Sequence, residues 1–187
     1  RFALSPLQDR GPMSHLLSSI FLFSLSAISY ELILIRLLDV VFFTDHSAVV
    51  ISLALLGFGL SGVFCYWYHY KKIITGPKIF TVLNGLLYLI SLKSSFYLAA
   101  QIPFNSMEIL WDSKQVLYFL SMVMILSVPF FLVSNVIMTL FMMFQKQIPK
   151  LYGVDLLGAG GGALASYALL SFFSLSQSLV ALTIMTL

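Results

Sequence analysis

A glycine cluster beside an acidic residue is the first feature of this chain that could carry chemistry. The segment Gly158–Ala163 matches G-x-G-x-x-[G/A], a pattern that cradles the pyrophosphate of a dinucleotide when it follows a buried strand. That use also needs an acidic residue about 20 positions later. No Asp or Glu follows Asp155, and a basic loop stands where the strand should be, so the sequence predicts no nucleotide site.

The same glycines suit close packing between helices in a membrane. Gly158, Gly162 and Ser166 recur every four residues, which places them on one helix face. Such stripes let the backbones of two helices come close together, which favours association in lipid, where no hydrophobic effect drives helices together. Gly57 and Ser61 begin a second stripe. We therefore expect two packing seams, which could contact each other, although the sequence does not choose their partners.

Asp155 has two interpretations. It precedes the apolar segment that contains the glycines, and there a carboxylate can cap free backbone N–H groups and meet the positive end of the helix dipole. The functional alternative is a binding or proton-handling carboxylate at the cytoplasmic mouth of a helix bundle.

Glu31 and Lys93 are charged residues inside apolar segments. Each lies seven residues before the outer end of its predicted span, about 10 Å deep at 1.5 Å per residue. A carboxylate at that depth must be paired, protonated or hydrated, so we expect Glu31 and Lys93 to pair across helices. Alternatively, Glu31 bonds hydroxyls or backbone and Lys93 reaches outward. Arg36 is turned by about 140° from Glu31 on the same helix, and is better placed to reach outward or to meet Asp39.

The composition indicates that lipid is the main solvent. Of 187 residues, 60% are hydrophobic and 9% are charged, whereas soluble domains carry roughly 25% charged residues. The net charge of +3 is small and dispersed, which argues against a nucleic-acid partner. The three histidines and the single cysteine show no metal-binding spacing, and no catalytic set or cofactor site is predicted.

Apolar stretches of about 20 residues cross a bilayer as helices. The sequence predicts an all-α integral membrane protein, a single polytopic bundle of about six transmembrane helices over residues 1–187. Proline removes a backbone hydrogen bond, so Pro129 is expected to kink the fourth span. The predicted spans are 16–38, 48–68, 79–100, 116–144, 156–173 and an incomplete sixth at 176–187.

The loop charges predict the orientation. Seven of the ten basic residues fall on the side that also carries the N-terminus, and the opposite loops are mainly acidic. Basic loops face the cytoplasm, so we expect a multi-pass protein of the bacterial inner membrane with a cytoplasmic N-terminus. The basic residues on that side are Arg1, Arg10, Lys71, Lys72, Lys78, Lys146 and Lys150.

Two passages resemble a known family. The segments Ser29–Leu38 and Leu55–Gly62 resemble the opening of the membrane part of bacterial spermidine-synthase-like fusion proteins. Pro129–Phe131, followed by Tyr152–Gly162, resembles its later signature, Y-x-x-D-L-x-G-A-x-x-G.

The resemblance implies half of a major-facilitator-type fold. Tyr30, Arg36 and Asp155, which lie in these passages, are candidate functional or capping residues. In that family a cytoplasmic Rossmann-like domain carries the chemistry, and no such domain is recognisable within these 187 residues. The resemblance therefore implies a membrane module rather than polyamine synthesis by this chain.

Three functions are compatible with these features. The first is a membrane module that anchors or scaffolds a larger assembly, with the lipid bilayer and other membrane subunits or a cytoplasmic domain as partners. The second is one half of a transporter for a small polar or cationic solute. The third is the membrane part of an aminopropyl- or methyltransferase.

Overall fold

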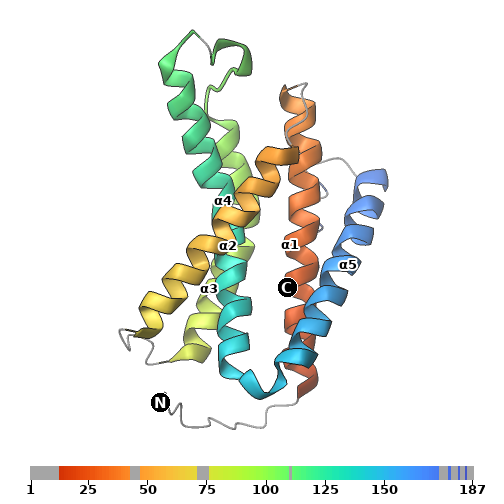
Figure 1. Cartoon of the computed structure of the whole chain (residues 1–187). Helices are drawn as coiled ribbons and strands as arrows, with labels where there is room; N and C mark the ends of the chain where they lie inside the picture. The colour runs from red at the N-terminus through yellow and green to blue at the C-terminus, as the bar shows by residue number, and fades with distance from the viewer. Residues whose placement is uncertain are drawn as a thin grey trace.

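The computed structural model describes residues 13–42, 47–70, 76–109 and 111–172, with three isolated positions at 177, 181 and 184. Regular structure in this part of the chain is entirely helical. Five long helices and two short 3-10 turns form an elongated bundle, shown in Figure 1. Their bounds are α1 Met13–Phe42, α2 Ser47–Tyr70, α3 Pro77–Ala100, η1 Ser106–Glu108, α4 Ser113–Met143, η2 Gln145–Gln147 and α5 Ile148–Phe172.

All five long helices are long and apolar enough to cross a membrane. This confirms the all-helical prediction, and α1 to α4 coincide within a few residues with the first four predicted spans. The fifth was placed too late, because α5 begins at Ile148 rather than at residue 156. Pro149 fits the first turn of that helix, where no backbone N–H is needed. The predicted sixth span, 176–187, lies almost wholly outside the described residues.

Local sequence sets several helix ends. Gly76 precedes Pro77 at the start of α3, and its carbonyl accepts from the Phe80 amide at 3.0 Å. The Asp112 carboxylate caps α4 by accepting from the Lys114 amide at 2.9 Å. α4 continues through Pro129 as one helix from Ser113 to Met143.

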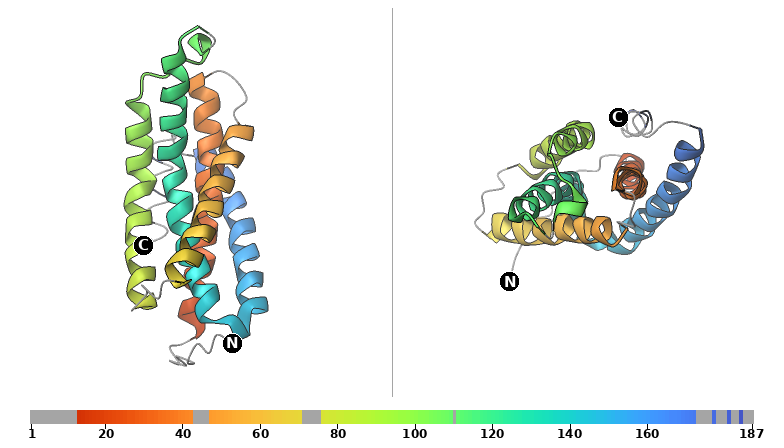
Figure 2. Two further views of the ribbon diagram at one scale, coloured as in Figure 1. Left: turned by 60° about the vertical axis from the view of Figure 1, so that its left-hand side comes forward. Right: turned by 90° about the horizontal axis from the view of Figure 1, so that it is seen from above.

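The helices form two groups. α4 packs on both α2 and α3, while α5 packs mainly on α1. Smaller contacts of α1 with α2 and α4 join the groups, as the view from above in Figure 2 shows. Each long helix runs the length of the bundle and the next one returns, so the odd-numbered helices run in the same direction. α1 and α5 therefore lie side by side with both N-termini at the same end.

The main hydrophobic core lies where α1, α2, α3 and α4 meet. Its largest fully buried side chains include Tyr30, Tyr88 and Phe130. The Tyr30 and Phe130 rings lie 5.3 Å apart between centroids. Two of these three core residues carry hydroxyl groups, so the centre of the bundle is partly polar.

Candidate functional site

The glycines of α5 form a seam with α1. A Cβ added at Gly158 would lie 2.5 Å from the Phe21 carbonyl oxygen, and one at Gly162 would overlap the Leu25 carbonyl oxygen. Ser166, the third member of the predicted stripe, is also buried. The two backbones are therefore in direct contact along this face, as expected for a stripe of small residues.

Hydroxyl groups of α1 reinforce this seam. Ser29 donates to the Gly162 carbonyl oxygen at 2.9 Å. Ser24 donates to the Asp155 carboxylate, which is half-buried. Because Gly162 has no side chain, α1 can come close enough for the Ser29 hydroxyl to reach the Gly162 carbonyl oxygen.

The N-cap prediction for Asp155 was wrong. α5 begins at Ile148 and has no acidic residue in its first turn, so Asp155 lies about 10 Å farther along the helix. Its backbone neighbours are already paired within the helix, and its carboxylate turns to the Ser24 hydroxyl on α1. Asp155 is an interhelical hydrogen-bond acceptor.

The second stripe packs on a different helix. A Cβ at Gly57 would lie 2.6 Å from Cβ of Phe130 and 2.9 Å from the Phe131 nitrogen, both on α4. Ser61 is fully buried and donates to Oδ1 of Asn135, also on α4, at 2.7 Å. The two small-residue stripes therefore serve separate seams, α2 with α4 and α1 with α5.

Asn135 is the centre of a buried polar cluster that the sequence did not reveal. Its Oδ1 accepts from Ser61 and, at 3.3 Å, from the Cys65 thiol. Its Nδ2 donates to Oδ1 of Asn84 on α3 at 3.2 Å. Asn84 in turn donates to the Phe80 carbonyl oxygen at 2.8 Å. The Asn135 carboxamide thus joins α2, α3 and α4. The sequence feature that could have indicated this cluster is the presence of two asparagines, Asn84 and Asn135, inside apolar segments.

Two tyrosine–serine pairs link α1 to α3. The Tyr30 hydroxyl of α1 lies 2.9 Å from Oγ of Ser95 on α3. In the reverse direction, the Tyr88 hydroxyl of α3 lies 2.5 Å from Oγ of Ser26 on α1. A long side chain opposite a short one bridges two helices whose backbones are not in close contact. Tyr30, a candidate functional residue, is thus a buried structural link.

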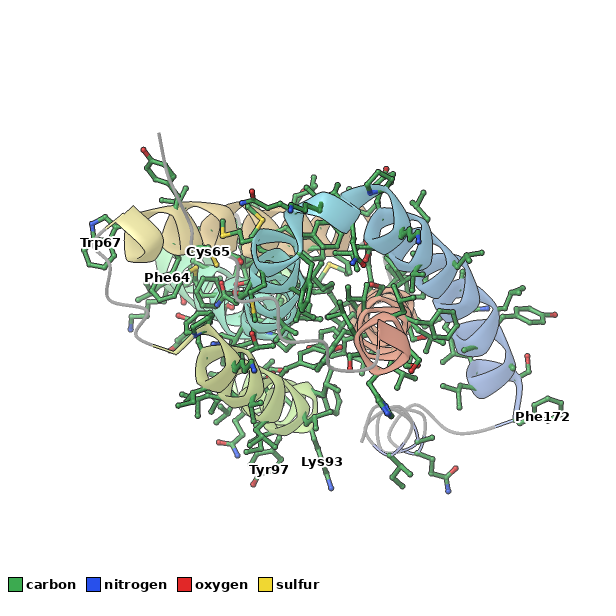
Figure 3. The ribbon with its side chains drawn as sticks, turned by 90° about the horizontal axis from the view of Figure 1, so that it is seen from below. Phe64, Cys65, Trp67, Lys93, Tyr97 and Phe172 are labelled. Carbon is green, nitrogen blue, oxygen red and sulfur yellow. The ribbon has the colours of Figure 1, made fainter. Side chains whose placement is uncertain are left out.

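The predicted pair of Glu31 and Lys93 is not brought together. Lys93 is exposed and points out of the bundle from α3 in Figure 3, next to Tyr97. Two residues turn a helix by about 200°, so Lys93 faces away from Ser91 and Ser95, which are buried. Glu31 is half-buried on α1.

Arg36 is exposed on α1. Among the described residues, no hydrogen bond or neighbouring charge acts on the Glu31 carboxylate. Glu31 follows Ser24 by seven residues, so it lies on the same face of α1 as the Ser24–Asp155 contact, about 10 Å farther along. Glu31 and Asp155 therefore border the same face of α1, with no contact between the two carboxylates.

No protein-family model, curated protein or solved structure matches this chain. The functional argument therefore depends on the contacts described above.

The chemistry available within the described residues is limited. Most buried polar side chains bond to one another or to backbone carbonyls, as the Asn135 cluster does. In that part of the chain, no three His, Cys, Asp or Glu side chains are grouped so that they could hold a metal ion. The described arrangement is that of a helix bundle locked by internal hydrogen bonds, with one half-buried carboxylate on α1, Glu31, and one on α5, Asp155.

Proposed function

We propose that this chain is a multi-pass membrane module that anchors or scaffolds a larger assembly. The observation that carries this proposal is the outward face of α5. That helix packs mainly on α1 and presents its opposite side to the surroundings.

The outward face of α5 combines glycine with large apolar residues. Around positions 153 and 160 no atom lies within 4 Å of an added Cβ. At spacings of three and four residues this face consists of Gly153, Leu156, Gly160, Leu164 and Tyr167. Leu164 is 75% and Tyr167 78% exposed. Lipid can cover leucine, but a face that alternates glycine and leucine also suits a further transmembrane helix, which could approach the backbone closely.

In this proposal the protein lies in the bacterial inner membrane with its N-terminus in the cytoplasm. The five described helices would belong to half of a major-facilitator-type bundle. The resemblance to spermidine-synthase-like proteins belongs to the same proposal, and a cytoplasmic catalytic domain would be one part that the module anchors.

The test is purification of the complex from native membranes, followed by native mass spectrometry. Gly160→Leu fills the outward face of α5 and is expected to release stoichiometric partner subunits. Gly59→Leu is the matched control, because Gly59 on α2 also has open space around it. Equal partner retention by Gly160→Leu and the wild type would contradict the proposal.

A transporter half for a small polar or cationic solute is the second candidate. The observation that favours it is the half-buried Glu31 carboxylate on the face of α1 that also carries the Ser24–Asp155 contact. Intramembrane carboxylates often mark solute or proton paths. Uptake into vesicles should fall with Glu31→Gln if this is the function, while Lys93→Gln, on the outside of α3, should leave uptake unchanged.

A further inference from the structure

The parallel α1 and α5 leave an open depression near the end at which both helices begin. It has a volume of about 470 Å³ and is lined by Leu17, Ser18, Phe21 and Leu22 of α1 and Val154 of α5. The lining is apolar apart from one serine hydroxyl, so it suits a hydrocarbon chain.

The end of the bundle next to this depression carries two basic side chains. α1 and α5 begin side by side there, and neither helix has an acidic residue in its first turn. Lys146 of η2 and Lys150 of α5 are both exposed at this end. Lys150 lies one helical turn before Val154, on the same face of α5. The Asp155 carboxylate already accepts from Ser24.

The depths of these features match the layers of a bilayer leaflet. Val154 lies six residues beyond Ile148, about 9 Å along α5. The headgroup layer on each side of a membrane is about 5–8 Å thick. If the helix ends lie at the membrane surface, the basic groups face the headgroup layer and the apolar depression begins just below it.

We propose that the depression binds an anionic phospholipid, with one acyl chain against Leu17, Phe21 and Val154 and the phosphate near Lys150 and Lys146. Basic sites between helices on the cytoplasmic side have this chemistry. The inference rests on the proposed insertion in a membrane, and it adds a lipid ligand that the scaffold proposal does not require.

The test uses the full chain purified in mild detergent and titrated with phosphatidylglycerol or phosphatidylcholine, with bound lipid counted by native mass spectrometry. We expect preferential retention of phosphatidylglycerol, weakened about fivefold for each of Lys146→Gln and Lys150→Gln. Lys114→Gln, at the opposite end of the bundle, should change nothing. Val154→Trp should displace the acyl chain and reduce binding of both lipids.

Several outcomes would overturn the inference. They are equal retention of the two lipids, an effect of Lys114→Gln as large as that of Lys150→Gln, or full competition by inorganic phosphate alone, which would indicate a free-anion site. The two lysine variants alter exposed side chains and keep the test valid if Val154→Trp does not fold. Recovery of the chain in the soluble fraction would instead refute membrane insertion, and thus the proposed function itself.

Discussion

Asn135 of α4 donates to Asn84 of α3 over 3.2 Å while it accepts from Ser61 of α2 over 2.7 Å. A single carboxamide therefore connects three helices in the middle of an apolar bundle. Each of these bonds satisfies a polar group that has no water nearby if the bundle lies in lipid. The same contacts fix the rotation of α2 and α3 about their axes, because only one face of each helix carries the matching group.

Replacement of Asn135 should loosen the three-helix group. Asn135→Leu removes the acceptor for Ser61 and the donor to Asn84, and interhelical hydrogen bonds in membranes contribute about 0.6 kcal/mol on average and up to about 1.7. We expect the free energy of unfolding to fall by about 1–3 kcal/mol, measured by denaturant titration in bicelles. Ser94→Ala is the control, because the exposed Ser94 bonds only to the Ile90 carbonyl of its own helix. A wild-type unfolding curve for Asn135→Leu would refute the structural role of the cluster.

Bulk at Gly162 should separate α1 from α5. A side chain there meets the Leu25 backbone, which cannot rotate away, and overpacking typically costs about 1–3 kcal/mol. We expect Gly162→Leu to lower the melting temperature of the purified chain. Gly160→Leu, two residues away on the open face, should melt as the wild type does even if it changes assembly. Equal melting temperatures for the two variants would show that the seam does not stabilise the fold.

The tyrosine hydroxyls should stabilise the joint between α1 and α3. Tyr88→Phe leaves Ser26 without its interhelical partner, and the expected loss is about 0.5–1.5 kcal/mol. Tyr30→Phe should have a similar effect through Ser95. Tyr97→Phe, on the outer side of α3, is the matched control in the same denaturant titration. A loss for Tyr97→Phe as large as for Tyr88→Phe would contradict this explanation.

Cysteine labelling tests the proposed orientation. In a Cys65→Ser background, Trp111→Cys should react with a membrane-impermeant maleimide in intact cells, because Trp111 is 85% exposed between α3 and α4. Lys150→Cys, at the opposite end, should react only after the cells are opened. The reverse pattern would place the N-terminus outside.

Hydropathy was enough to predict the helices. Each described span is a run of apolar residues of bilayer length, and that property is local in sequence. The start of α5 was missed because Pro149 and Lys150 reduce the hydropathy of a segment that is nevertheless helical. A helix end depends on backbone hydrogen bonding, which hydropathy does not measure.

The contacts between helices could not be predicted in the same way. Equal depth was the only ground for pairing Glu31 with Lys93, yet depth says nothing about rotation, and Lys93 faces away from the core of the bundle. Asn84 and Asn135 are buried polar residues in apolar spans, and the cost of such burial was a usable signal for a shared contact. The small-residue stripes marked the packing faces, while the choice of α1 and α4 as partners depended on the whole bundle.

The seam between α1 and α5 also bears on the order in which the protein is synthesised. The hydrogen bond from Ser29 to Gly162 joins residues 133 positions apart. The α2, α3 and α4 group can assemble as soon as α4 leaves the ribosome, since α4 contacts both of the others. Throughout that interval the face of α1 that receives the glycines still lacks α5, the described helix that packs on it. Of the described helices, the first to be made is therefore the last whose packing is complete.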